Sequence, residues 1–215
     1  MRAWFLLLPT LLLTLGGCGD APLRAAWSGL SRRLPAGDPV TAEAAEGAPD
    51  GPALRLRVGG RAARASLVQE QGERRLWRAG AGLVVATDGG RVVATSGLRE
   101  VLVATRFDGP DPLASPAGLA EGRSVEARRL VDLMRPDRDP RGMRFGVPVR
   151  CRLRASPLAE DEAVLLVEER CRAGAEGAHR NRFWTDAATG AVLRAEQWVG
   201  PGLPPMTVDF PEAGD

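Results

Sequence analysis

Residues 83–96 read LVVATDGGRVVATS. Two runs rich in β-branched residues flank the tripeptide Asp88-Gly89-Gly90. Runs of this kind joined by a glycine-rich turn are typical of a β-hairpin. The stretch therefore predicts two antiparallel strands, one over residues 83–87 and one over residues 91–96.

Short runs of the same kind recur on both sides of this hairpin. Further strands are expected at residues 53–58, 63–69, 74–78, 101–106, 124–134, 145–173 (a hairpin), 182–185, 191–199 and 206–210. No long helical pattern separates them, and parallel strands would need long crossover connections. We therefore expect an all-β domain over residues 53–215. It should be a single antiparallel meander, folded as a curved sheet, a sandwich or a half-open barrel.

The composition narrows the possible functions. The 215 residues include 26 Gly and 17 Pro, a density that disfavours long helices. A net charge of +2 makes nucleic acid an improbable partner. All basic residues are Arg, which excludes Schiff-base chemistry on a lysine. The single histidine, His179, leaves few general-base or metal-ligand arrangements, so we expect no catalytic residues, no cofactor and no metal.

The amino terminus has the pattern of an exported, lipid-anchored protein. Residues 3–15 form an apolar run that is too short to span a bilayer and suits the core of a signal peptide. The run ends in Leu15-Gly16-Gly17-Cys18, which resembles the lipobox of bacterial lipoproteins, where the cysteine is lipidated after cleavage. We therefore expect a signal peptide at residues 1–17 and a lipidated Cys18, carrying palmitate-type chains, that anchors the protein in a membrane.

The residues after Cys18 indicate which membrane holds the protein and how the β domain is connected to its anchor. In the sorting rule of many bacterial lipoproteins, Asp directly after the cysteine retains the protein at the inner membrane. Gly19 at this place favours the outer membrane, facing the periplasm, while Asp20 one place later keeps the inner membrane as an alternative. Within residues 18–52, a short helix is expected at 22–33 and a flexible Pro- and Gly-rich linker at 35–52.

Cys151 and Cys171 are expected to form a disulfide, because an exported chain meets an oxidising compartment. Cys151 lies in a run where apolar residues alternate with arginines, the period of a half-buried strand. A second strand follows at residues 164–172, with a turn at 156–162 between them. The midpoint of the two cysteines falls in that turn, so a simple hairpin places their sulfurs opposite each other. A redox-active pair, the alternative, usually has CxxC spacing.

Four segments carry a resemblance to a known family. They are Leu76-Trp77-Arg78, GGRVVATSGL at 89–98, FWTD at 183–186 running to Gly190, and RAEQWVGP at 194–201. In this order, over roughly residues 50–210, they resemble the YjbF/GfcB family of exopolysaccharide and group 4 capsule lipoproteins. The resemblance implies a β-rich, anchored, periplasm-facing protein that is associated with making or exporting surface polysaccharide. It implies no enzymatic activity.

The disulfide register also groups four arginines. Arg150, Arg152, Arg170 and Arg172 would lie on one face of the hairpin, where like charges oppose each other unless an anion or solvent screens them. An acidic polysaccharide or a lipid phosphate would supply such an anion. The alternative is a solvated strand face in an arginine-rich chain.

Aromatic residues are the other candidates for ligand contact. Trp77, Trp184 and Trp198 would stack on sugar rings if exposed, whereas the alternative is that they anchor the core. Phe183 and Trp184 are adjacent and should point to opposite faces of a strand. His179 lies among polar residues near an expected turn, which predicts a surface histidine.

These observations support three hypotheses. The favoured one is a non-enzymatic, lipid-anchored β protein that serves polysaccharide production or export through contacts with export proteins or with acidic polysaccharide. The second is a lipid or lipoprotein carrier, because the strand, turn and strand at 184–190 also resemble half-barrel lipoprotein shuttles. It predicts a deep apolar cavity inside the sheet. The third, an envelope hydrolase, predicts a cleft with convergent carboxylates of perturbed pKa.

Overall fold

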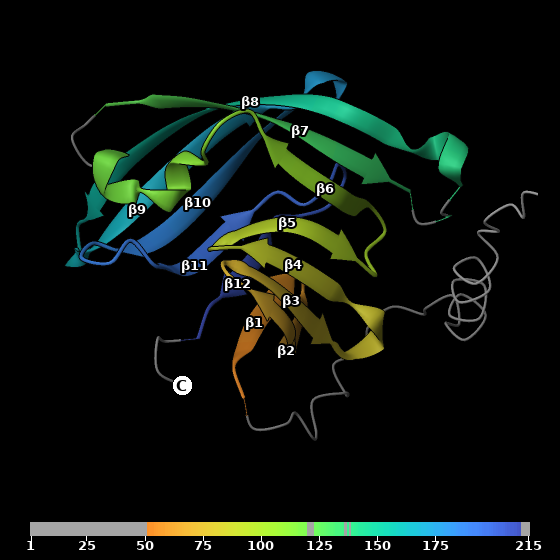
Figure 1. Ribbon diagram of the computed structural model, residues 1–215, viewed down its shortest axis with the longest axis horizontal. Coiled ribbons are helices and arrows are strands. Elements are labelled where there is room, and N and C mark those ends of the chain that lie inside the picture. The colour runs from red at the N-terminus through yellow and green to blue at the C-terminus, as the bar shows by residue number, and fades with distance from the viewer. Residues whose placement is uncertain (1–50, 120–122, 136, 138, 212–215) are drawn as a thin grey trace, which may run out of the picture. The chain divides into compact units, whose positions relative to one another are not determined.

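The computed structural model describes residues 51–119, 123–135, 137 and 139–211, and it confirms the all-β antiparallel fold (Figure 1). Its strands are β1 Ala53–Val58, β2 Arg61–Gln71, β3 Arg74–Ala79, β4 Val84–Asp88, β5 Arg91–Ser96, β6 Val101–Phe107, β7 Val125–Met134, β8 Arg144–Leu158, β9 Asp161–Arg172, β10 Ala178–Asp186, β11 Val192–Gln197 and β12 Met206–Asp209.

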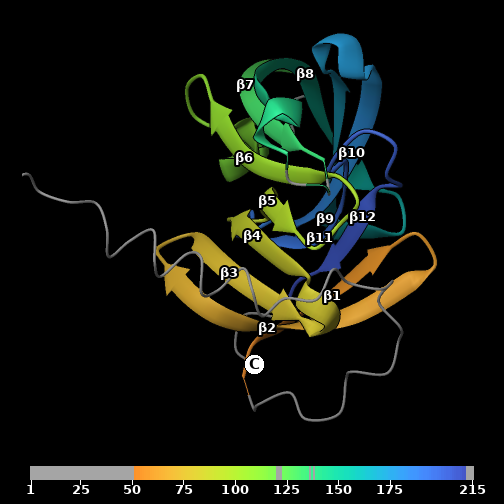
Figure 2. The ribbon, with the colours of Figure 1, turned by 90° about the vertical axis from the view of Figure 1, so that its right-hand side faces the viewer.

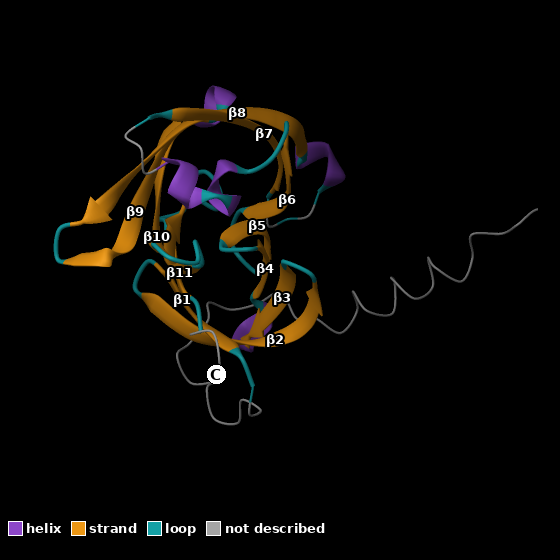
Figure 3. Cartoon of the chain, turned by 60° about the vertical axis from the view of Figure 1, so that its left-hand side comes forward, coloured by secondary structure: helices purple, strands orange, loops and turns teal. Residues whose placement is uncertain are grey.

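Short 3-10 turns lie between successive strands: η1 Gly80–Gly82, η2 Pro112–Ala114, η3 Pro116–Leu119, η4 Pro140–Gly142 and η5 Gly174–Glu176. None of the helices in the described residues is long and apolar enough to cross a membrane. Figure 3 shows η2 and η3 inside the curve of the sheet, where Leu113 and Leu119 join the hydrophobic core.

The sheet is a meander whose first and last strands pair with each other. The strand order is β5-β4-β3-β2-β1-β12-β11-β10-β9-β8-β7-β6, so the two edges are the consecutive strands β5 and β6. Figure 2 shows these edges side by side. The amide of Leu102 on β6 donates a hydrogen bond to Thr95 Oγ1 on β5 at 3.1 Å in place of a backbone ladder. The sheet is therefore a half-open barrel, one of the architectures that the sequence predicts.

The β8–β9 hairpin has the predicted register. Cys151 lies directly opposite Cys171, and their sulfurs form a disulfide 2.07 Å long. Val149, Cys151 and Leu153 are buried while the arginines between them are exposed. Apolar side chains at every second position bury one face of the strand, which fixes which face of the hairpin looks inward.

A network of charged side chains crosses the interior. Glu169 on β9 is fully buried and accepts hydrogen bonds from Arg91 Nη1 at 3.0 Å and Arg129 Nη1 at 2.8 Å. Asn181 donates to the same carboxylate, and Asp111 accepts from Arg91. Burial alone would raise the pKa of Glu169, but the two guanidinium groups outweigh burial and hold this pKa well below its usual range.

This network bears on two of the three hypotheses. Between β5 and β9 the interior holds the ion pairs of Glu169 with Arg91 and Arg129, whereas a lipid carrier requires apolar space. The most strongly perturbed carboxyl, that of Glu169, is enclosed by its partners and does not face a cleft. This network is thus neither the apolar cavity that the carrier hypothesis predicts nor the cleft that the hydrolase hypothesis predicts.

The start of β10 differs from the prediction. The strand begins at Ala178, four residues before the expected Arg182, because His179–Arg182 pair with β9 although their sequence is polar. His179 consequently sits within the sheet and is not the surface histidine that the sequence predicts. The predictions for residues 1–50, which include the signal peptide, Cys18, the short helix and most of the linker, lie outside the described residues.

Candidate functional site

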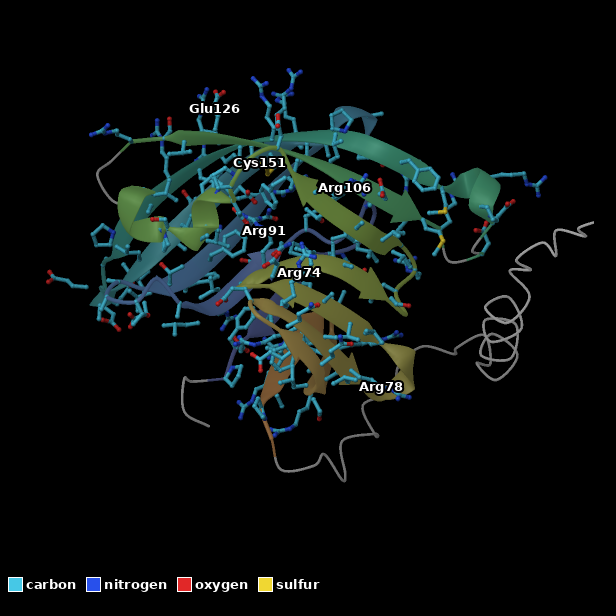
Figure 4. The ribbon with its side chains drawn as sticks, in the orientation of Figure 1. Arg74, Arg78, Arg91, Arg106, Glu126 and Cys151 are labelled. Atoms are coloured by element: carbon cyan, nitrogen blue, oxygen red, sulfur yellow. A yellow bond between two sulfur atoms is a disulfide. The ribbon has the colours of Figure 1, made fainter. Side chains whose placement is uncertain are left out.

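The outer face of strands β7, β8 and β9 carries a group of six arginines. We call it the arginine face; its members are Arg128, Arg150, Arg152, Arg154, Arg170 and Arg172. Strand register places Arg128, Arg150 and Arg172 side by side across the three strands, and Arg152 beside Arg170. All six side chains are exposed. In Figure 4, Glu126 projects outward from this side of the sheet, while Arg91 lies on the inner side.

Acidic neighbours neutralise only part of this charge. Arg152 pairs with Glu126 at 3.0 Å, and Glu168, which lies opposite Arg154 in the register, pairs instead with Arg180 at 3.2 Å. Within the described part of the chain, the other five arginines of the face form no salt bridge. Like charges directly opposite each other repel, so a bound anion would relieve the repulsion between these guanidinium groups.

The four arginines predicted to share a face do so, and the register adds Arg128 and Arg154. Arg128 could not be assigned from the sequence, because its place depends on how β7 pairs with β8. Proximity of the arginines is therefore observed, whereas their binding to an anion remains a prediction.

A pocket of about 450 Å³ opens beside this face. It lies between the start of β10 and the loop that leads from β11 to β12. Its lining consists of Glu176, Ala178, His179, Arg180, Arg182, Glu196, Trp198, Pro201, Gly202, Leu203 and Pro205. Register connects it to the arginine face, because Ala178 is the partner of Arg172 and Arg180 is the partner of Arg170.

The pocket contains an aromatic pair. The ring of His179 stacks on the indole of Trp198 with centroids 4.4 Å apart and an angle of 12° between the planes. The amide of Trp198 donates to Asn181 Oδ1 at 2.8 Å, which links this pair to the buried network. Burial, assisted by the charge of Arg129, lowers the pKa of His179 to about 4, so the imidazole is neutral near pH 7.

The three candidate tryptophans have different environments. Trp77 is 1% exposed in the core and donates from Nε1 to Thr87 Oγ1 at 3.0 Å, so it cannot contact a sugar and that candidate was wrong. Trp184 is half-buried on the opposite side of β10 from buried Phe183, as predicted, and the guanidinium of Arg194 lies over its ring. Only Trp198 lines the pocket described above.

Comparison with known proteins decides the family. The family model described as "Group 4 capsule polysaccharide lipoprotein gfcB, YjbF" matches residues 41–210. The chain belongs to the YjbF family. The match covers all twelve strands of this YjbF protein and both the arginine face and the pocket.

A solved structure supports the fold of the YjbF chain independently. The crystal structure of the hypothetical lipoprotein YmcC from Escherichia coli (K12) is similar to it with a TM-score of 0.58 and 19% sequence identity. The similarity covers 81% of this chain and 90% of YmcC. No curated protein matches the sequence. At this identity the likeness to YmcC shows a shared fold, and the family match connects the chain with capsule polysaccharide.

Proposed function

We propose that this YjbF protein is a non-enzymatic lipoprotein that serves the production or export of a surface polysaccharide by holding an acidic polysaccharide on its arginine face. Anchoring through Cys18 in the outer membrane, with the β domain facing the periplasm, is part of the proposal. The lipobox-like sequence at residues 15–18 and the family description support the anchor.

The observation that carries the proposal is the row of Arg128, Arg150 and Arg172, which pairs with no carboxylate of the residues that the structure describes. A strand rises about 3.3 Å per residue, so outward side chains on one strand repeat every 6–7 Å, and neighbouring strands lie about 4.8 Å apart. A flexible polyanion with a carboxylate on many of its sugars can engage several of these guanidinium groups at once. Each added contact is then intramolecular, which raises the affinity without new chemistry.

A lipid phosphate is the competing anion for this face. We favour the polysaccharide because the arginine face continues into a pocket whose lining mixes aromatic, cationic and acidic groups. Such a mixture suits a ligand with ring faces, hydroxyls and carboxylates better than a simple phosphate surface.

Affinity electrophoresis tests the proposal. The purified full-length protein, held in neutral detergent, is run through gels that contain either polygalacturonate or neutral dextran. We expect retardation by polygalacturonate only, weakening as salt is added because the contacts are exposed. Substituting Arg150, Arg170 and Arg172 by Gln should abolish the retardation.

A matched control separates this face from charge in general. Arg57→Gln, Arg61→Gln and Arg64→Gln remove the same charge from exposed positions on β1 and β2 and should leave the retardation intact. Equal loss in both triple variants, or retardation by dextran, would contradict the proposal. Binding to phosphatidylglycerol vesicles without binding to polygalacturonate would assign the face to lipid instead.

A further inference from the structure

The pocket beside Trp198 exists because β11 is shorter than β10. The ladder between these strands pairs Arg182 with Glu196 but stops there, whereas β9 covers β10 as far as Ala178. After Gln197 the chain leaves the sheet, and the Trp198 amide bonds the side chain of Asn181 instead of continuing the ladder. On the side where β11 would continue, residues 178–180 of β10 consequently line the pocket and pair with no residue of β11.

Two arginines in the lining keep most of their hydrogen-bond capacity. Arg180 pairs with Glu168 at 3.2 Å and Arg182 pairs with Glu196 at 3.3 Å, each through a single nitrogen, Nη1. A guanidinium has five N–H donors, so donors remain on both. Exposed ion pairs of this kind are weak, so an incoming carboxylate can share or replace these partners.

The remaining lining supplies complementary groups. Glu176 accepts from Arg144 at 2.6 Å and Glu196 accepts from Arg182 at 3.3 Å, each through one oxygen. An ionised carboxylate has about four acceptor positions, so both can also accept hydrogen bonds from hydroxyl groups. Trp198 adds an apolar indole whose orientation is held by stacking on His179. One ring-shaped ligand with several hydroxyls and a single carboxylate would use all of these groups.

We infer that this pocket is a subsite for one carboxylate-bearing sugar of the polysaccharide, whose chain continues from the pocket over Arg170 and Arg172. The inference rests on the proposed function of the arginine face. Continuity follows from the register, in which Arg172 neighbours Ala178 and Arg170 neighbours Arg180. The arginine face contributes general attraction for a polyanion, and the pocket recognises an individual sugar.

His179 provides a direct readout, because it is the only histidine in the chain and its NMR signals need no assignment by mutation. The full-length protein in detergent, with labelled histidine, is titrated with trigalacturonate and with the neutral maltotriose. We expect trigalacturonate to shift the ring signals of His179, and maltotriose to leave them in place at the same concentration.

Two matched variants test the role of the lining. Arg182→Gln should raise the dissociation constant for trigalacturonate about tenfold. Arg194→Gln, which removes a similarly exposed arginine that pairs with Asp209 and lies over Trp184 outside the pocket, should change it less than about twofold. Neither side chain is buried, so both variants should fold.

The outcomes separate the two proposals. Binding of trigalacturonate that is lost in the arginine-face triple variant but leaves His179 unshifted would overturn the subsite and keep the proposed function. An equal shift of His179 by maltotriose would overturn the requirement for a carboxylate. If trigalacturonate and polygalacturonate both fail to bind, the proposed function falls, and the subsite falls with it.

Discussion

Glu169 is a buried carboxylate that joins three side chains of the interior. It faces inward from β9, where its neighbours at alternate positions, Val167 and Cys171, are buried and apolar. A buried charge is tolerated only when it is paired and hydrogen-bonded. Here two arginines and one asparagine donate hydrogen bonds to the carboxylate. Arg91 comes from β5 and Arg129 from β7, two strands near opposite ends of the strand order.

We predict that Glu169→Gln lowers the free energy of unfolding by about 3 kcal/mol or more, because it leaves two buried guanidinium groups with one carboxylate fewer. Urea unfolding followed by tryptophan fluorescence measures this change. Glu168→Gln is the control: its side chain is the next one along β9, faces outward and makes one exposed ion pair, so about 1 kcal/mol or less is expected. Similar effects of the two substitutions would contradict the role given to the network.

His179 should make the stability of the fold depend on pH. Its pKa is about 4 in the folded protein, against about 6.5 in an unfolded chain. Between these values the unfolded chain binds a proton that the folded protein does not. The free energy of unfolding contributed by this group is therefore fully present above pH 6.5 and falls as the pH drops towards 4.

NMR titration of the His179 ring checks this prediction directly, and a midpoint near 6.5 would show that burial does not act as described. In His179→Gln the loss of stability between pH 6.5 and 4 should be smaller than in the unchanged protein. Thermal unfolding at several pH values gives the comparison.

Part of the residue-scale arrangement is visible in the sequence. Arg129 stands in the inward phase of β7, between Ala127 and Val131, and Glu169 stands in the inward phase of β9. A charged residue at a position where the strand otherwise has apolar, inward-facing side chains indicates a buried ion. The sequence does not show that Arg129 and Glu169 meet, because their contact depends on how β7, β8 and β9 pair.

Among the elements, the β4–β5 hairpin links the open edge to the rest of the sheet. Its turn contains Gly90, where an added Cβ would lie 2.1 Å from the Cβ of Val192 on β11. Next to it, Gln197 on β11 bonds both backbone groups of Val92, accepting at 3.1 Å and donating at 2.7 Å. The hairpin is thus seated on a strand that is distant in the sheet order.

We predict that Gly90→Ala destabilises the fold by about 1–3 kcal/mol, since the added methyl group must displace the backbone or Val192. Gly60→Ala is the matched control, because no atom lies within 4 Å of its added Cβ and its backbone needs no positive φ. It should change stability by less than about 0.5 kcal/mol. Urea denaturation of both variants measures the difference, and equal values would argue against seating of the hairpin on β11.

The elements themselves were largely predictable, because alternation and glycine-rich turns act locally. β1 and β5 have the predicted bounds, and the β8–β9 register follows from the cysteines. The start of β10 was missed because polar residues there are held by pairing with β9 and by the Asn181–Glu169 contact. The pocket was missed for a related reason: it depends on where β11 ends relative to β10.

At the scale of the whole molecule, one sheet separates two kinds of charge. Its inner side holds arginines that are matched by carboxylates, and the outer side of β7–β9 holds arginines that mostly lack a carboxylate partner among the described residues. Removing one partner of a buried ion pair destabilises a fold strongly, whereas unmatched surface charges contribute little to folding. The arginine face is therefore free to vary without loss of the fold, which allows its function to be tested separately.

The most direct test of the central claim is made in cells that lack the gene. They are complemented with the unchanged protein, with the triple variant of Arg150, Arg170 and Arg172, or with the control triple variant of Arg57, Arg61 and Arg64, at equal protein levels. Surface polysaccharide is then quantified. We predict that the unchanged protein and the control restore it and that the arginine-face variant does not. Full restoration by the arginine-face variant would contradict the account.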